Sequence, residues 1–148
     1  MTAWRFAHFD ELSAREVHDI LLARSAVFVV EQACVFLDMD GADTASWHLY
    51  TRAGDEIAAY CRLLPPGLKY AEPSIGRVIT TRVARGKGQG RALMVQALRH
   101  SSQLWPGQAV RIGAQLYLEK FYGSLGFARD SEPYDEDGIA HIEMLRRG

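Results

Sequence analysis

Residues 82–98, with the sequence RVARGKGQGRALMVQAL, combine glycines and basic side chains at a spacing suited to binding a phosphate. The glycines and the cations alternate along the chain: Arg82, Arg85, Gly86, Lys87, Gly88, Gly90 and Arg91. Glycines let a ligand approach the backbone, and the free N–H groups where a helix begins attract an anion. The segment therefore predicts an anion site between a strand and a helix, with a basic surface turn as the competing interpretation.

Two common nucleotide motifs do not fit this segment. A P-loop requires lysine and then serine or threonine after its last glycine, whereas Gly90 is followed by Arg91 and Ala92. The dinucleotide fingerprint requires a further glycine three residues after Gly88, where Arg91 stands. The sequence therefore indicates neither a P-loop NTPase nor a nicotinamide enzyme.

The glycine segment lies within an alternation of strand and helix patterns. Strands are predicted at 3–9, 47–52, 56–64, 75–83, 109–115 and 139–147, with room for a short one after Phe127. Helices are predicted at 13–26, 91–101 and 116–126. Ser13 and Glu16 have the spacing of a capping box at the first helix. Hairpin strands followed by βα units predict an α/β fold with a mixed sheet and helices on its faces.

Length and composition restrict the function classes. A chain of 148 residues fits one domain over 1–148, and its net charge of −1 indicates neither a nucleic-acid nor a membrane-surface partner. Cys34 and Cys61 have no paired spacing, which favours reduced thiols over a disulfide scaffold or a zinc site. The N-terminal sequence lacks a signal-peptide pattern, and no apolar run is long enough to span a bilayer. We therefore expect a cytoplasmic protein.

Two motifs in this order resemble a known family. The spacing Arg85-x-x-Gly88-x-Gly90 between a strand and a helix resembles motif A of the GNAT superfamily of acetyl-CoA-dependent N-acetyltransferases, and FYGSLGF at 121–127 resembles motif B. The resemblance covers essentially the whole chain. RSAVFVVEQ, LDMDGAD, GAQ and YDEDGIAHIEM resemble the ElaA-like subgroup of small bacterial GNAT proteins, although Val35 stands where that subgroup is expected to carry proline.

The resemblance implies a GNAT acyl-CoA N-acyltransferase fold, with a mixed sheet that splays near the end of strand 75–83, and acetyl-CoA as co-substrate. The backbone of Val78, Ile79 and Thr80 would then pair with the pantetheine arm. The residues implied to surround the pyrophosphate are Arg85, Gly86, Lys87, Gly88, Gln89, Gly90 and Arg91. Gln115 would hydrogen-bond the pantetheine or Tyr122. The 3′-phosphate contact stays open among Arg82, Lys87 and Lys120, for which solvation alone is the simpler interpretation.

Acetyl transfer to an amine requires a base for the amine, stabilisation of an oxyanion and a proton for the departing thiolate. Tyr122 occupies the motif B position of the acid, and a phenol with a pKa of about 10 suits a thiolate. A backbone N–H near Ile79 or Thr80 would polarise the thioester carbonyl. The base stays open among Glu31, His141 and His48, and for each of them taken singly a structural role is the more common explanation.

Two acidic loops would border the acceptor site in this architecture, and their residues are Asp38, Asp40 and Asp43 in the first and Asp135, Glu136 and Asp137 in the second. They either draw in a cationic amine or are solvated turn carboxylates. A calcium loop starting at Asp38 is excluded, because its glycine comes too early and its twelfth position is Leu49. No metal is expected.

The predicted function is acetyl transfer from acetyl-CoA to a primary amine of a small molecule, by direct attack on the thioester. Two alternatives stay open. RSAVFVVEQ also resembles acyl-homoserine-lactone synthases, which share the GNAT fold, and a non-catalytic acyl-CoA sensor would use the same coenzyme loop. GNAT proteins frequently dimerise, so a homodimer is also left open.

Overall fold

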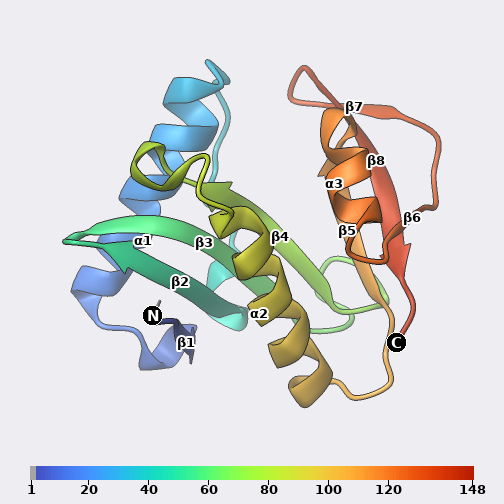
Figure 1. Ribbon diagram of the computed structural model, residues 1–148, viewed down its shortest axis with the longest axis horizontal. Helices are drawn as coiled ribbons and strands as arrows, with labels where there is room; N and C mark the ends of the chain where they lie inside the picture. Colours follow the sequence, from blue (N-terminus) through green and yellow to red (C-terminus); the bar gives the residue numbers. More distant parts are fainter. Residues whose placement is uncertain (1–2) are drawn as a thin grey trace.

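The computed structural model describes residues 3–148, and its centre is an eight-stranded sheet with helices on both faces (Figure 1). The strands are β1 Arg5–His8, β2 Trp47–Ala53, β3 Glu56–Leu64, β4 Ser74–Thr80, β5 Val110–Gln115, β6 Ala128–Arg129, β7 Tyr134–Glu136 and β8 Ile139–Arg146. Their order is β1-β2-β3-β4-β5-β8-β6, with β7 paired to β8. Only β4 and β5 pair in parallel, so the predicted mixed sheet is confirmed.

The helices are α1 Ala14–Arg24, α2 Gln89–Leu104 and α3 Glu119–Gly123. The predicted capping box begins α1: the Glu16 N–H donates to Ser13 Oγ at 3.1 Å, and the Ser13 N–H donates to Glu16 Oε1 at 2.9 Å. Helical backbone continues past α1 as a π-helix over Ser25–Glu31, so the first helical region ends five residues later than predicted. Such π-turns are frequent at functional sites.

Two apolar cores, one on each face, hold these helices against the sheet. Residues of β3 alternate between the cores, because successive side chains of a strand point to opposite faces. Cys61 belongs to the core under α2 and α3, together with Leu93 and Tyr122. Tyr60 belongs to the core under α1, together with Ile20. Coverage on both faces explains why every residue of β3 after Glu56 is buried.

The sheet splays between β4 and β5. Their ladder consists of the single pair Ser74–Arg111, after which the strands diverge from this closed end like the arms of a V (Figure 1). A β-bulge accompanies the divergence: β4 carries one extra residue opposite β3 between Gly76 and Ile79, and Arg77 has φ +50°. Bulges bend a strand and increase its twist. The predicted splay is therefore confirmed, with a bulge at its origin.

The remaining differences from the sequence predictions are local. The strand predicted at 75–83 ends at Thr80, where a 3₁₀ turn begins the glycine loop. The helix predicted at 116–126 divides into a 3₁₀ turn and the short α3. The short strand after Phe127 is present as β6, whereas β7 was not predicted. Over residues 3–148, the structure contains no helix with the length and apolar character needed to cross a membrane.

Candidate active site

A cleft with a volume of about 830 Å³ fills the splay between β4 and β5. Its size is within the range of small-molecule sites. The cleft brings together nine of the side chains and backbone positions proposed from the sequence: Glu31, Val78, Ile79, Thr80, Arg85, Gly90, Gln115, Tyr122 and His141. The other proposed coenzyme residues lie beside the cleft wall, in the glycine loop and at the start of α2: Gly86, Lys87, Gly88, Gln89 and Arg91.

One edge of β4 faces this cleft without a partner strand. On its other edge, Ile79 pairs with Tyr60 and Thr80 pairs with Ala59. Within the described residues, β5 pairs with β4 only at Ser74. Backbone N–H and C=O groups require hydrogen-bond partners. The edge beyond the bulge can therefore bind an extended ligand that carries amide groups.

The glycine loop has the geometry of an anion site. Gly86 and Gly88 have φ values of +79° and +71°, a region that other residues rarely adopt. Gly88 is the N-cap of α2, and no side chain caps the helix, so its first N–H groups are available to a ligand. Gln89 Oε1 is buried without a hydrogen-bond partner in the described residues. A polar ligand at this helix terminus would supply the missing contacts.

The basic side chains of the loop are engaged to different degrees. Arg91 Nη2 donates to Ser124 Oγ at 2.8 Å, which ties α2 to the end of α3. Arg85 donates from Nε and Nη2 to the Thr80 carbonyl at 3.2 and 3.1 Å. Arg85 Nη2 also donates to Glu31 Oε1 in an ion pair. Arg82, Lys87 and Lys120 are exposed, and their contact with a 3′-phosphate stays a prediction.

Glu31, one of the candidate bases, ends the π-helix and is held by Arg85. In this arrangement the Arg85 guanidinium occupies the Glu31 carboxylate. The next residues also contact the cleft walls. Gln115 Nε2 donates to Gln32 Oε1 at 3.5 Å, and the Cys34 thiol donates to the Asp137 carbonyl at 3.2 Å. Residues 31–34 thus connect both arms of the splayed sheet.

Tyr122 lies on α3 with 6% of its surface exposed, and it also lines the cleft. Its ring packs edge-on against Phe121 and Phe127, with centroid distances of 5.1 and 6.0 Å. Burial raises the pKa of the Tyr122 phenol above its ordinary value. The phenol stays protonated at neutral pH and can donate a hydrogen bond into the cleft.

His141 lies on β8 directly opposite Gln115 of β5, so both side chains point to the same face of the sheet. Its Nδ1 lies 2.8 Å from the Ile139 carbonyl, which can only accept a hydrogen bond. The neutral ring therefore carries its proton on Nδ1 and leaves Nε2 as the basic nitrogen. Glu136 Oε2 lies 3.4 Å from that nitrogen.

His48, the third candidate base, is buried and lies away from the large cleft, beside a smaller apolar pocket. Its Nε2 donates to the Asp43 carbonyl at 2.9 Å, and its Nδ1 accepts from the Tyr60 hydroxyl at 2.6 Å. Burial lowers the pKa of the imidazole. With both nitrogens occupied, His48 supports the fold and is not available as a base.

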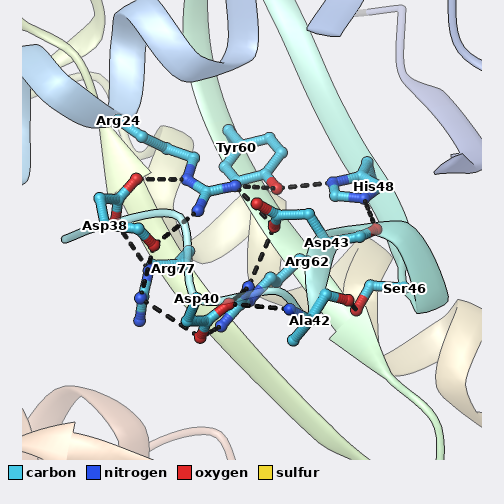
Figure 2. Close-up of polar contacts among 10 residues, drawn as sticks. All are labelled: Arg24, Asp38, Asp40, Ala42, Asp43, Ser46, His48, Tyr60, Arg62 and Arg77. Carbon is cyan, nitrogen blue, oxygen red and sulfur yellow. Dashed lines mark hydrogen bonds and ion pairs between the residues drawn. The ribbon is translucent and has the colours of Figure 1, made fainter.

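The first acidic loop is held by three arginines from the sheet and α1 (Figure 2). Arg24 Nε donates to Asp38 Oδ2 at 2.9 Å, and Arg24 Nη1 donates to Asp43 Oδ1 at 2.8 Å. The guanidinium of Arg62 forms hydrogen bonds of 2.8 and 2.6 Å to Asp40, and one of 3.0 Å to Asp43. Arg77 Nε lies 2.8 Å from Asp38 Oδ1.

Both sequence interpretations are therefore wrong for Asp38 and Asp43, which are largely withdrawn from solvent and paired with guanidinium groups. Asp40 lines the cleft and is 38% exposed, but it too is paired, with Arg62 and Arg77. The hydrogen bond from Arg62 lowers the pKa of the Asp40 carboxyl well below its ordinary value. In the second loop, Glu136 and Asp137 line the cleft as expected, whereas Asp135 is exposed and accepts from the Gly138 N–H at 3.3 Å.

Sequence reasoning missed several cleft residues, which include Phe28, Phe36, Arg62, Lys69 and Arg77. Arg77 is the most informative, since its guanidinium lies 6.0 and 5.8 Å from the ring centres of Phe28 and Phe36. These residues follow no local motif. Over the described part of the chain, no cluster of three or more His, Cys, Asp or Glu side chains is placed to hold a metal ion.

The comparisons with known proteins agree with this geometry. Residues 25–147 match the family model described as an acetyltransferase (GNAT) domain. Protein ElaA of Escherichia coli is 40% identical over 148 residues, which cover 99% of this chain and 97% of ElaA. The crystal structure of E. coli ElaA matches with a TM-score of 0.93 over 99% of this chain and 100% of that chain. An acyl-CoA N-acyltransferase from Pseudomonas aeruginosa matches with a TM-score of 0.94 and 38% identity over 99% of each chain.

The acyl-homoserine-lactone synthase LasI is similar only in fold. Its structure matches with a TM-score of 0.79 but with 13% sequence identity, over 99% of this chain and 90% of that chain.

Proposed function

The chain belongs to the GNAT family of acetyltransferases, and from this premise we propose that it transfers the acetyl group of acetyl-CoA to a primary amine bound in the β4–β5 cleft. The observation that carries the proposal is the splay. A single ladder pair between β4 and β5 leaves the backbone edge of Val78, Ile79 and Thr80 unpaired in a cleft that also contains Tyr122.

The coenzyme would bind along β4 and end at the start of α2. The pantetheine arm carries two amide groups, which would pair with backbone groups on the open edge of β4 at residues 78–80, where the Thr80 carbonyl already accepts from Arg85. The pyrophosphate would lie at the glycine loop, where the uncapped N-terminus of the 16-residue helix α2 supplies N–H donors and a favourable dipole. Gln115, which lines the cleft on β5, would hydrogen-bond the pantetheine arm.

Acetyl-CoA supplies an activated thioester carbonyl, and the protein supplies donors and a base around it. A backbone N–H of β4 near Ile79, just after the bulge at Arg77, would polarise the carbonyl oxygen. The protonated Tyr122 phenol would donate to the sulfur as the thiolate departs. Because burial raises the pKa of Tyr122, the phenol keeps this proton until a strong base forms beside it.

We assign the base to His141. Of the three candidates, Glu31 is paired with Arg85, and His48 has both ring nitrogens occupied. His141 Nε2 has no donor to accept from in the described residues and lines the cleft. Ile112, Ala114 and Ile142 belong to the core under α2 and α3, so His141 points to the opposite face of the sheet. The amine would therefore enter from the face that α1 covers.

The test is calorimetric titration of acetyl-CoA into the purified protein and a Gly88→Glu variant. A carboxylate at this N-cap repels the pyrophosphate, and φ +71° strains any side chain there. We expect saturable binding to the native protein and none to Gly88→Glu. Gly54→Glu is the matched control, because Gly54 has φ +63°, open space around it and a place in the distant β2–β3 turn.

Each outcome has a separate meaning. Native binding that persists in Gly88→Glu would reject the glycine loop as the pyrophosphate site. If the native protein binds no acetyl-CoA, the proposed function is wrong. If the native protein binds acetyl-CoA and Gly88→Glu does not, turnover is tested by thiol release with a panel of primary amines.

A further inference from the structure

We propose that Arg85 and Glu31 form an exchangeable ion pair. The pyrophosphate of the coenzyme replaces Glu31 on Arg85, and the released Glu31 carboxylate binds the ammonium form of the acceptor amine. This inference rests on the proposed function, since it takes the glycine loop as the pyrophosphate site. It gives Glu31 a role as the residue that positions the acceptor, and it makes that role depend on bound coenzyme.

Arg85 is held in place independently of Glu31. Its Nε and Nη2 both donate to the Thr80 carbonyl at the end of β4. Its side chain is 44% exposed, and it lines the cleft at the beginning of the glycine loop. Loss of the Glu31 contact would therefore leave the guanidinium beside the loop, where a phosphate can bind it by charge-assisted hydrogen bonds.

Glu31 depends on Arg85 for its counter-charge. Among the described residues, its carboxylate has no other ion-pair or hydrogen-bond partner. It is also the last residue of the π-helix, and the C-terminal end of a helix disfavours negative charge. Its side chain is 25% exposed, so water solvates it only in part. A Glu31 carboxylate that lost Arg85 would therefore attract another cation in the cleft.

The other carboxylates in the cleft are not connected to the coenzyme loop. Asp40 is paired with Arg62 and Arg77, and Glu136 lies beside His141. Asp137 is exposed at the turn before β8. Among the described residues that line the cleft, only Glu31 pairs its carboxylate with a residue of the glycine loop. A phosphate at this loop therefore changes the charge balance of Glu31 specifically.

The exchange couples the two substrates. A carboxylate beside the pyrophosphate site competes for Arg85, so Glu31 opposes coenzyme binding in the free protein. Once the coenzyme is bound, the uncompensated carboxylate strengthens binding of a cationic amine. Coupling of this kind is reciprocal, so a bound ammonium also strengthens coenzyme binding. The acceptor class is therefore an amine that is positively charged when it enters, and it binds more tightly once the coenzyme is bound.

Calorimetry with coenzyme A tests whether Glu31 competes with the pyrophosphate for Arg85, because it shows whether Glu31→Gln binds coenzyme A more tightly or more weakly than the native protein. Removing a partly exposed competing carboxylate should tighten binding to Glu31→Gln by about two- to fivefold, the range of partly exposed ion pairs. If the pair instead holds the loop in its binding conformation, Glu31→Gln will bind more weakly, and that result overturns the proposal. Asp19→Asn is the matched control, since Asp19 pairs with Arg52 at 3.0 Å, is 20% exposed and lies outside the cleft.

Carboxyl-carbon NMR tests the release of Glu31 without any turnover. With coenzyme A bound, the carboxyl-carbon signal of Glu31 should shift at constant pH, because the carboxylate has lost its contact with Arg85. Ethylammonium should then perturb the Glu31 signal in the coenzyme-bound protein and leave it unchanged in the free protein. A Glu31 signal that does not respond to coenzyme A, or an equal response to ethylammonium in both states, overturns the proposal.

Failure of the exchange differs from failure of the proposed function. If native protein and both variants bind no coenzyme A, the coenzyme site itself is wrong. If the native protein binds coenzyme A but Glu31→Gln binds it more weakly, only the exchange is wrong.

Discussion

At the scale of single residues, burial and partners decide what each candidate group can do. Three bases were equivalent in the sequence, and their contacts separate them: His48 is occupied at both nitrogens, Glu31 is paired with Arg85, and His141 uses only Nδ1 in a hydrogen bond. The same holds for Tyr122, whose phenol is kept neutral by burial. Chemical role therefore follows from environment as much as from residue type.

Tyr122→Phe tests the acid directly. Phenylalanine keeps the ring packing against Phe121 and Phe127 but removes the donor, so binding of acetyl-CoA should be unchanged. The rate of thiol release should fall by about 10²–10⁴-fold, the usual contribution of a positioned acid. Tyr117→Phe is the control, since Tyr117 lines the same cleft with 75% of its surface exposed. Equal rates for the two variants would assign the proton to another donor.

At the scale of elements, ion pairs with arginines of α1 and β3 hold the acidic loop of residues 38–43 in place. Buried guanidinium groups on α1 and β3 each need a carboxylate, because an unpaired buried charge is strongly destabilising. Arg24 is fully buried, and Arg62 is 1% exposed. The loop satisfies both, and it thereby closes the face of the sheet beside the cleft (Figure 2).

Asp43→Asn should destabilise the fold, because Asp43 is shared by Arg24 and Arg62. Removing one partner of such a buried pair costs roughly 3–5 kcal/mol in the free energy of unfolding. Urea unfolding at pH 7 measures this loss. Asp55→Asn, in the exposed β2–β3 turn, makes the same chemical change and should cost less than about 0.5 kcal/mol. Similar losses in both variants would show that the network contributes little.

The same network predicts the direction of the pH dependence. Burial opposes ionisation of Asp43, but hydrogen bonds from Arg24 and Arg62 prevail and lower its pKa. A carboxyl with a lower pKa in the folded state stabilises the fold above its unfolded pKa of about 3.9, and this stabilisation is lost as pH falls through the folded pKa. Native protein should therefore lose stability below about pH 4 more steeply than Asp43→Asn.

At the scale of the whole molecule, the splay divides the sheet into two arms whose strands pair with each other only at Ser74–Arg111. The core under α2 and α3 also joins the two arms. A ligand that adds hydrogen bonds along β4 would complete the interrupted sheet. Ligand that binds only the folded protein also stabilises it by mass action. Coenzyme binding should therefore stabilise the junction between the two arms more than it stabilises either arm alone.

Amide hydrogen exchange tests this expectation. Addition of coenzyme A should raise protection at residues 76–80 of β4 and at 112–115 of β5, where the strands have diverged. The β2–β3 turn at Gly54 should show no local change beyond the global stabilisation. Protection confined to residues 82–88 would place the coenzyme on the loop and outside the splay.

Local patterns in the sequence were enough to predict much of the fold. The order of the main strands and helices, the Ser13 capping box and the mixed sheet are confirmed by the structure. Strand alternation, helical period, capping and turn glycines act over a few residues, so the sequence records them directly. Motifs A and B are also local patterns, and they predicted the GNAT fold and a coenzyme site at the end of β4.

The ion pairs between distant residues could not be predicted from local patterns in the sequence. Arg24 and Asp38 are 14 residues apart, Arg62 and Asp43 are 19 apart, and Arg85 and Glu31 are 54 apart. No local pattern marks such pairs, because they form only when packing brings distant elements together. The burial that shifts the pKa of Tyr122 arises in the same way. Residue types therefore limit which reactions are available, whereas the folded arrangement of charges and cleft walls selects among them.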